Sequence, residues 1–294
     1  MSTEINSSNP NFTIRQAKRP DWLKAKIPSG KEYLRLDTIM RSHKLHTVCE
    51  EARCPNIGEC WNFGTATFMI LGDICTRSCG FCAIKTGRPE YGLDWDEPRR
   101  VAEAVELMNI RHAVITSVNR DEREDGGAPI FAETVRLIHE RIPNCRVEVL
   151  IPDFKGSEEA LEIVLESKPD ILNHNIETVP RLYREVRPQA NYKQSLEVLH
   201  RAQKKGFVTK TGLMLGIGER TEEIIEVMND ARTVDCQILT LGQYLQPTKD
   251  HLPIDRYVHP EEFTMLKNEG MKMGFRFVES GPLVRSSYHA AGQV

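Results

Sequence analysis

Six of the eight cysteines lie between residues 49 and 82, in two groups of three. The groups are Cys49, Cys54 and Cys60, spaced C-x4-C-x5-C, and Cys75, Cys79 and Cys82, spaced C-x3-C-x2-C. The first ten residues are polar and lack an apolar signal core, so we expect a reducing compartment where clustered cysteines bind metal rather than form disulfides. Two groups of three do not match the paired cysteines of a structural zinc site.

The second group places three thiols on one loop of eight residues. Three thiolates can hold three irons of a cubane [4Fe–4S] cluster, whereas ferredoxin-type clusters use four cysteines. The missing fourth ligand leaves one iron open to a small chelating molecule, which favours catalysis over electron storage. Phe81 is apolar and could shield such a cluster from solvent. The alternatives are a loop with incidental cysteines and a zinc site with a distant fourth ligand.

The chain after the first cysteine group alternates between strand and helix patterns. Strands are predicted over 65–71, 112–117, 146–151, 170–174, 209–215, 237–241 and 275–279. Helices are predicted over 97–109, 129–141, 157–167, 191–205, 221–234 and 260–273, with a short helix within 31–47. This alternation with short connections predicts right-handed βαβ units and a parallel sheet. We expect an α/β fold, a partial or full (β/α) barrel with its site at the carboxyl ends of the strands, or alternatively a doubly wound open sheet.

Composition excludes several classes of protein. With 40% hydrophobic and 28% charged residues among 294, the chain is globular. Its 39 basic and 42 acidic residues lack the basic excess of a nucleic-acid-binding protein. No apolar run reaches transmembrane length, and the N-terminus lacks the Arg-rich pattern of a transit peptide. We therefore expect a cytoplasmic protein without nucleic-acid or membrane partners. Residues 1–30 form a basic, Pro-containing arm that could contact an acidic carrier domain or be a solvated tail.

The second cysteine loop, C-x3-C-x-F-C after a first strand, resembles the signature of the radical S-adenosylmethionine (SAM) superfamily. That resemblance implies that the methionyl amino and carboxylate groups of SAM chelate the open iron. It also implies reductive cleavage of SAM to a 5′-deoxyadenosyl radical, which abstracts hydrogen from unactivated C–H bonds. The typical fold of the superfamily is a partial or full (β/α) barrel.

The first cysteine group, in the segment 48–60, resembles the lipoyl synthase family. Further resembling segments are 64–72, 116–120, 125–127, 152–154, 173–175, 186–188, 240–247 and 284–289, so that the resemblance covers roughly residues 20–290. It implies an auxiliary [4Fe–4S] cluster held by the three cysteines of this group and by a serine of Arg-Ser-Ser-Tyr. Ser286 and Ser287 are the candidates, and Ser287 is favoured. An alkoxide ligand is poorly matched to a site of soft sulfur ligands and should leave readily.

The resemblance implies a sulfurtransferase that inserts sulfur at C6 and C8 of an octanoyl chain on a carrier-protein lysine. The auxiliary cluster would donate the sulfur, and two SAM molecules would be used per product. Implied partners are lipoyl carrier domains (2-oxoacid dehydrogenase E2 subunits and glycine cleavage H protein), a ferredoxin or flavodoxin as electron donor, and an iron–sulfur carrier that rebuilds the cluster. Implied regions are an extension 1–63, a barrel 64–280 and a C-terminal segment 281–294.

Candidate SAM-binding residues lie where the predicted strands end. They are Asn119, Asn173, Asn175, Glu177, Arg187 and Gly216. Alternation places the two later asparagines and the glutamate on one side of the chain, although helix capping or, for the glycine, a tight turn would also explain them. His46 and His174 are expected to be structural, the charge run 121–125 to be a solvated loop, and Cys145 and Cys236 to be small buried residues.

Three alternative functions remain at this point. One is another sulfur-inserting radical enzyme, such as a biotin synthase or a methylthiolating enzyme, which the placement of C-x4-C-x5-C upstream of the barrel disfavours. The second is a ferredoxin-like electron carrier, which would have fully ligated clusters and no SAM cleavage. The third is a zinc-binding interaction module, which would contain no iron.

Overall fold

The computed structural model of the chain describes residues 19–24, 34–36, 38–39, 46–47, 54 and 56–293. Its main sheet has eight described strands, seven of them parallel, with β1 antiparallel at one edge. In sheet order the strands are β1 (His46–Thr47), β2 (Thr65–Ile70), β5 (His112–Ser117), β6 (Arg146–Leu150), β7 (Ile171–Asn173), β8 (Val208–Leu215), β9 (Ile238–Gln243) and β10 (Phe277–Gly281).

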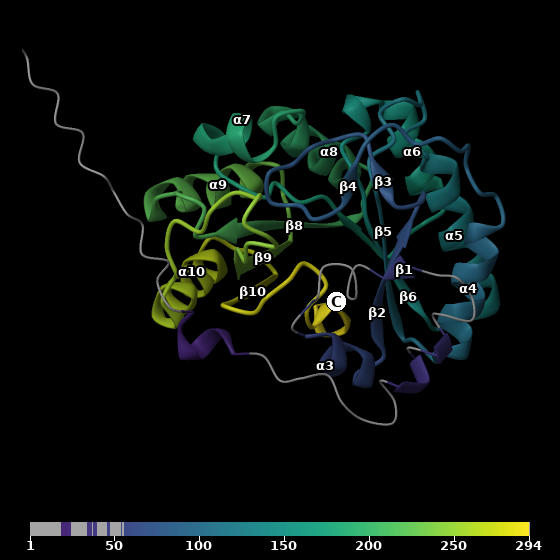
Figure 1. The fold of residues 1–294 in the computed structure, drawn as a ribbon, viewed down its shortest axis with the longest axis horizontal. Helices are drawn as coiled ribbons and strands as arrows, with labels where there is room; N and C mark the ends of the chain where they lie inside the picture. The colour runs from purple at the N-terminus through teal and green to yellow at the C-terminus, as the bar shows by residue number, and fades with distance from the viewer. Residues whose placement is uncertain are drawn as a thin grey trace, which may run out of the picture.

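The helices connect consecutive strands and cover the outside of the curved sheet (Figure 1). They are α4 (Glu97–Leu107), α5 (Ala128–Arg141), α6 (Glu158–Glu166), α7 (Tyr183–Val186), α8 (Tyr192–Lys204), α9 (Thr221–Thr233) and α10 (Pro260–Lys272). Local capping fixes several of their starts. Ser157 Oγ accepts a hydrogen bond from the Ala160 N–H at 3.2 Å, and Asn191 Oδ1 accepts one from the Gln194 N–H at 3.2 Å.

The strand order decides between the two predicted topologies. The parallel strands from β2 to β10 lie in chain order, and those two strands do not pair with each other in the described part of the chain. A doubly wound sheet would reverse its strand order at a switch point, so that alternative is wrong. The fold is a partial (β/α) barrel, in agreement with the predicted fold class, and its open side lies between β2 and β10.

The predicted strands and helices of the barrel are confirmed, with ends that differ by one or two residues. Several short elements were not predicted. They are α3 (Ile57–Asn62), the two-stranded sheet of β3 (Ile74–Cys75) and β4 (Lys85–Thr86), α7, and the 3-10 turns η1 (Asp21–Leu23), η2 (Phe154–Gly156), η3 (Pro180–Leu182) and η4 (Ala290–Gly292). Within 31–47, where a short helix was predicted, residues 34–36 and 38–39 are helical, and residues 46–47 form β1.

The C-terminal segment lies across the open side of the barrel. Figure 1 places the C-terminus beside α3, between β10 and β2. The segment lies directly on the backbone of β9, because a Cβ atom added to Gly242 would be 2.1 Å from the Val284 carbonyl oxygen. Only glycine allows so close an approach of two backbones. The C-terminal segment and α3, which precedes β2, therefore lie together where the sheet is open.

Candidate functional site

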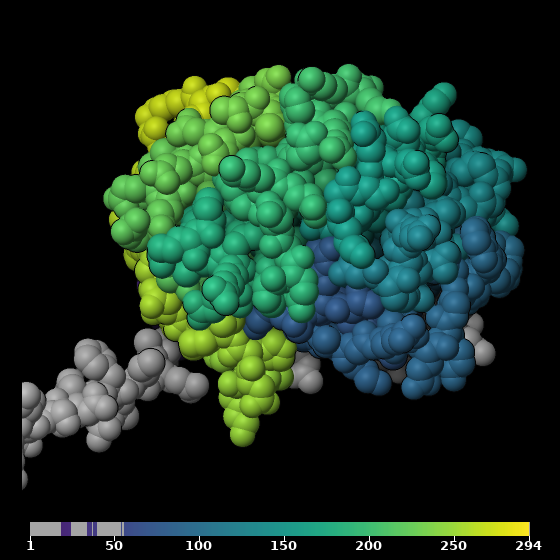
Figure 2. Space-filling view, turned by 90° about the horizontal axis from the view of Figure 1, so that it is seen from above, coloured from purple at the N-terminus to yellow at the C-terminus, as the bar shows by residue number. Residues whose placement is uncertain are grey.

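The second cysteine group lies on the loop that follows β2, at the carboxyl end of that strand. Cys75 is 8% exposed and belongs to β3, and its carbonyl oxygen accepts a hydrogen bond from the Gly87 N–H at 2.9 Å. In Figure 2, which views the molecule from above, the dark blue segment after β2 reaches the surface between the teal and green parts of the chain. The predicted position at the carboxyl edge of the barrel is confirmed for this loop.

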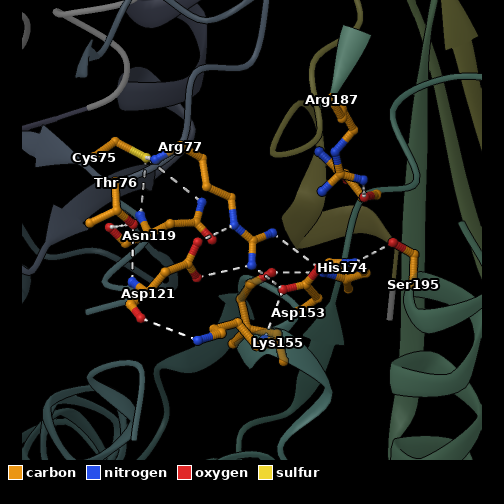
Figure 3. Close-up of polar contacts among 12 residues, drawn as sticks. Cys75, Thr76, Arg77, Asn119, Asp121, Asp153, Lys155, His174, Arg187 and Ser195 are labelled. Atoms are coloured by element: carbon orange, nitrogen blue, oxygen red, sulfur yellow. Dashed lines mark hydrogen bonds and ion pairs between the residues drawn. The ribbon is translucent and has the colours of Figure 1, made fainter. Parts of the chain in front are cut away.

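Arg77 anchors the loop to two other loops of the barrel. Its guanidinium lies between Asp121, after β5, and Asp153, after β6, with shortest distances of 2.6 Å to each (Figure 3). Arg77 is 4% exposed and Asp153 is 1% exposed. Burial by itself would raise the pKa of Asp153, but the hydrogen bonds and charge of Arg77 outweigh it and lower that pKa to about 2.

Asp121 corrects one prediction. The charge run 121–125 was expected to be a solvated loop, but its first residue pairs with the buried Arg77. The Asp121 N–H also donates to Thr76 Oγ1 at 3.0 Å, and that hydroxyl donates to the Asn119 carbonyl oxygen at 3.0 Å. These contacts join the loop after β5 to the cysteine loop. No local sequence signal identifies them, because the partners are more than 40 positions apart.

The three sulfurs of the loop lie close enough to influence one another. Burial raises the pKa of Cys82 to about 12, and the neighbouring Cys79 and Cys75 raise it further against a hydrogen bond from the Ile84 backbone. Burial also raises the pKa of Cys79. In the described residues no three His, Cys, Asp or Glu side chains are placed to ligate a single metal ion. The loop brings three thiols close enough to act electrostatically on one another.

Hydrogen-bond donors point at the first sulfur of the loop. The backbone N–H groups of Asn119 and Arg77 donate to Cys75 Sγ at 3.3 and 3.5 Å, and Asn119 Nδ2 lies 3.8 Å from the same sulfur (Figure 3). Donors of this kind stabilise a thiolate and tune an iron–sulfur cluster. The donor set fits a cluster at this position.

Glycine packing holds the middle of the loop against the second half of the barrel. A Cβ atom on Gly80 would lie 2.7 Å from Leu252 Cγ. The Gly80 N–H donates to the Val186 carbonyl oxygen at 3.0 Å, and the Leu252 N–H donates to the Gly80 carbonyl oxygen at 2.9 Å. His251 Nε2 lies 3.0 Å from the Cys82 carbonyl oxygen. The loop is thus fixed from both sides.

Four of the predicted SAM-binding residues surround this loop. Asn175 Nδ2 donates to Glu177 Oε1 at 3.1 Å, and Arg187 and Glu177 both act electrostatically on Cys79. Burial raises the pKa of Glu177, against the opposing charge of Arg187. Asn119 Oδ1, Asn175 Oδ1 and Arg187 Nε are buried and have no hydrogen-bond partner among the described residues. Buried polar atoms without partners are unusual, and a polar ligand beside the cysteines would satisfy them.

The other two predicted SAM-binding residues have structural contacts. Asn173 Nδ2 donates to Glu148 Oε1 at 2.7 Å inside the barrel, where that carboxylate also pairs with Lys210 at 3.0 Å. Burial would raise the pKa of Glu148, but the charge of Lys210 lowers it to about 2. Gly216 has φ +95°, and a Cβ atom there would lie 2.3 Å from Gln243 Nε2. These contacts support the tight-turn interpretation of Gly216 and place Asn173 in an internal polar network.

Two further predictions concern histidine and single cysteines. His174 is buried, with Nδ1 2.9 Å from the Ile151 carbonyl oxygen and Nε2 3.0 Å from Ser195 Oγ. Burial lowers its pKa to about 4, so its structural role is confirmed. Cys145 and Cys236 are buried, as expected. For His46 the structure describes the backbone alone.

The first cysteine group is partly described, since Cys49 lies outside the described residues. Asn56 Nδ2 donates to the Leu283 carbonyl oxygen at 2.6 Å, and the Tyr288 hydroxyl donates to Glu59 Oε2 at 3.2 Å. Burial raises the pKa of Cys54, and the charge of Arg285 opposes that rise. The C-terminal segment is thereby brought against the first cysteine group.

The predicted ligands of that region are brought into the same part of the fold. The segment between Leu283 and Tyr288 contains both candidate serines, Ser286 and Ser287, and both are half-buried. Cys54 and Cys60 are half-buried as well. In the described part of the chain, no helix is both long and apolar enough to cross a membrane.

Comparison with known proteins adds family information to this geometry. A profile described as the radical SAM superfamily matches residues 69–231, and one described as the N-terminal domain of lipoyl synthase matches residues 4–54. A lipoyl synthase of Rubrobacter xylanophilus is 61% identical over 277 residues, covering 94% of this chain and 86% of the relative. A mitochondrial lipoyl synthase of Nematostella vectensis is 53% identical, covering 97% and 98%.

Solved structures support the fold. A methylornithine synthase has a TM-score of 0.55 at 15% identity, covering 88% of this chain and 84% of its own. The FeFe-hydrogenase maturase of Carboxydothermus hydrogenoformans has a TM-score of 0.57 at 17% identity, covering 78% of this chain and 64% of its own. Both likenesses concern the barrel architecture alone.

Proposed function

The chain belongs to the lipoyl synthase family of the radical SAM superfamily, and from this premise we propose which of its residues perform each part of the reaction. It is a radical SAM sulfurtransferase that uses SAM and [4Fe–4S] clusters. It inserts two sulfur atoms, at C6 and C8, into a carrier-bound octanoyl-lysine and forms lipoyl-lysine, with an auxiliary cluster as the sulfur donor.

We assign the radical-generating cluster to Cys75, Cys79 and Cys82. When bound, that cluster supplies the electron that cleaves SAM. The chain supplies three thiolates at the carboxyl edge of the barrel, and the backbone N–H groups of Asn119 and Arg77 donate hydrogen bonds to Cys75 Sγ. Arg77 holds the loop in place through the buried Asp153 and the half-buried Asp121.

We assign SAM binding to Asn119, Asn175, Glu177 and Arg187. The support is their position around the cysteine loop together with the unpartnered buried atoms of Asn119, Asn175 and Arg187. The buried guanidinium suits a carboxylate, and the glutamate with its neighbouring amide suits an amino or hydroxyl group. Asn173 Oδ1 is also buried without a hydrogen-bond partner among the described residues, but its amide nitrogen donates to Glu148 inside the barrel, and Gly216 is explained by its close contacts.

We assign the auxiliary cluster to Cys49, Cys54, Cys60 and Ser287, with Ser286 as the second candidate. The support is the contact between the first cysteine group and the C-terminal segment, at Asn56 with Leu283 and at Glu59 with Tyr288. In functional terms the chain divides into the extension 1–63, the barrel 64–280 and the C-terminal segment 281–294. β2 begins at Thr65 and β10 ends at Gly281, which supports these boundaries.

The substrate is an octanoylated carrier protein. We propose that it is a lipoyl domain of a 2-oxoacid dehydrogenase E2 subunit or the glycine cleavage H protein. We further propose that a ferredoxin or flavodoxin delivers the electrons and that an iron–sulfur carrier rebuilds the auxiliary cluster. A cytoplasmic location stays a prediction, since the relatives include bacterial proteins and one named mitochondrial.

The observation that carries the assignment is the joining of both cysteine groups to the barrel, one at the carboxyl edge and one at the open side. The test is an anaerobic assay of the reconstituted chain with SAM, a strong reductant and an octanoylated lipoyl-domain peptide. Mass spectrometry should show the gain of two sulfur atoms together with release of 5′-deoxyadenosine. Deoxyadenosine without sulfur gain would contradict the substrate, and neither product from a chain with both clusters would contradict the catalytic assignment.

A further inference from the structure

A cavity of about 640 Å³ opens at the amino-terminal ends of β2, β5 and β6. Parallel strands put their carboxyl ends at one edge, so this cavity lies at the end of the barrel away from the Cys75 loop. Its volume falls within the range of small-molecule sites, about 300–1,000 Å³. Cys60 and the η4 residues Ala291 and Gly292 form part of its wall. The cavity thus gives access from solvent to the first cysteine group by a route separate from the radical site.

The eleven residues that line this cavity include two arginines and two histidines. Arg111, Arg146, His112 and His289 line it, and Glu59 is the one acid among its lining residues. That glutamate already pairs with the Tyr288 hydroxyl, and His289 Nε2 lies 3.5 Å from its other oxygen. A cleft lined mainly by one sign of charge concentrates ligands of the opposite sign and speeds their arrival. The cavity is therefore suited to an anionic ligand.

The rim of the cavity presents groups that suit a protein partner. Phe63 is 59% exposed, although it is a large aromatic residue. Arg111 Nη2 donates to the Phe63 carbonyl oxygen at 3.1 Å, so the cation and the ring share one edge of the cavity. Arg146 is also exposed. Exposed aromatic and arginine side chains are the residue types that most often dominate protein–protein binding.

We infer that this cavity is the docking and delivery site for an anionic iron–sulfur carrier that refills the auxiliary site after each turnover. The inference rests on the proposed function, in which the auxiliary cluster loses its sulfur to the product. A [4Fe–4S] cluster held by four thiolates has a net negative charge, which matches the cationic wall. Cys60 on that wall is the first ligand that an arriving cluster would meet.

The delivery is a ligand exchange without electron transfer. Each thiol of this chain that binds iron gives up its proton, and each thiolate of the donor that leaves takes up one. The cluster keeps all its irons, sulfides and electrons. Arg111 and Arg146 attract the anionic donor and hold it in the cavity. They do not contact SAM or the octanoyl chain in this proposal.

The test uses two double variants and the wild type. The cavity variant carries Arg111→Gln and Arg146→Gln, and the charge-matched control variant carries Arg99→Gln and Arg136→Gln. The control arginines lie on the outer faces of α4 and α5, in exposed ion pairs. Each protein first completes one turnover, and the lipoyl product per chain is counted. A synthetic [4Fe–4S] cluster with four 2-mercaptoethanol thiolates, made with isotopically labelled iron, is then added, and its transfer is followed by Mössbauer spectroscopy.

We expect the first turnover to be equal in all three proteins, which also shows that the variants are folded. Delivery should be about tenfold slower in the cavity variant at low salt, with a difference that narrows as salt rises. The single substitutions should give intermediate rates. Equal delivery rates in all three proteins would overturn the inference. The inference would also be overturned if the cavity variant needed a different concentration of octanoylated carrier for its first turnover, because the cavity would then bind the substrate.

A wild-type chain with both clusters but without any first-turnover product would count against the proposed function instead. In that case the labelled-iron rates are measured on the cluster-free chain, whose auxiliary site is empty without turnover, and they still decide the delivery inference.

Discussion

The two cysteine groups are held by different kinds of contact. The loop 75–82 is fixed by Arg77, whose buried side chain bridges two aspartates from two other barrel loops. The segment around Cys54 and Cys60 meets the C-terminal segment instead, through a backbone carbonyl at Leu283 and an exposed side-chain pair between Glu59 and Tyr288. The first site is held by loops at the carboxyl edge of the barrel, and the second by the contact of residues 54–60 with the C-terminal segment.

This difference has an energetic meaning. Removing one partner of a buried, hydrogen-bonded ion pair leaves an unpaired charge and costs about 3–5 kcal/mol, whereas exposed pairs contribute about 0–1 kcal/mol. The loop 75–82 is therefore kept in one geometry through every catalytic cycle. The exposed pair between Glu59 and Tyr288 should contribute less to stability than the ion pairs of Arg77.

The largest expected effect separates the roles of the two groups. Cys79→Ala should reduce SAM cleavage to that of the cluster-free chain, because it removes a ligand of the radical-generating cluster. Cys54→Ala should leave SAM cleavage intact and abolish sulfur gain by the peptide. Deoxyadenosine and product are measured by mass spectrometry in the same anaerobic reaction. Loss of SAM cleavage in both variants would contradict the separate roles of the two cysteine groups.

A second substitution pair sharpens the auxiliary assignment. Ser287→Ala should lower sulfur gain by roughly ten- to a hundredfold, the range for loss of a group that supports a metal site. Ser286→Ala is the matched control, and its product yield should stay near that of the wild type. The reverse result would transfer the role to Ser286, and unchanged yields in both variants would remove the serine from the site.

Asp153→Asn tests the anchor of the first loop. The pKa of Asp153 is about 2 in the fold, below the usual value of about 3.9, so ionised Asp153 stabilises the fold by roughly 2–3 kcal/mol near neutral pH. That contribution is present above about pH 4 and is lost as the pH falls toward 2. The variant should unfold at a lower denaturant concentration than the wild type at pH 7. The difference in their free energies of unfolding should shrink below pH 4.

The matched control for that experiment is Asp96→Asn, which removes an exposed partner of Arg99 and should change stability little. If the difference in free energy of unfolding between Asp153→Asn and the wild type stays constant from pH 7 to pH 2, the charge of Asp153 is not the source of that difference.

The smallest expected effect is at the second site. Tyr288→Phe removes the hydroxyl that donates to Glu59, and its cost in denaturant unfolding should stay below about 1 kcal/mol. The comparison requires this cost to be smaller than that of Asp153→Asn. A larger loss from Tyr288→Phe would mean that the chain ends are held as firmly as the first loop.

Hydrophobic periodicity predicted the barrel because each strand and helix buries one face against the next. β5 and α5 are recognisable from their own residues, and the strand order follows from short right-handed connections. α3 was missed because six residues within the first cysteine group carry too little periodicity. The turn and helix over 180–186 were missed because they are single turns between longer elements.

The cysteines of the site were predictable from spacing, but the groups that support them were not. Arg77 and Asp153 are 76 positions apart, and nothing local to either residue predicts their contact. Asn173 and Asn175 look alike in the sequence, yet one bonds Glu148 inside the barrel and the other bonds Glu177 beside the cysteines. Such differences depend on which loops meet in three dimensions.

The contact of Asn56 with Leu283 spans 227 positions of the chain. A ribosome adds about 5–20 residues per second, so residues 54–60 wait tens of seconds for the segment that completes their surroundings. The loop 75–82 has its two aspartate partners much earlier, by residue 153. The two halves of the site therefore mature in sequence during synthesis, and the auxiliary half can be completed only after residue 283 has been added.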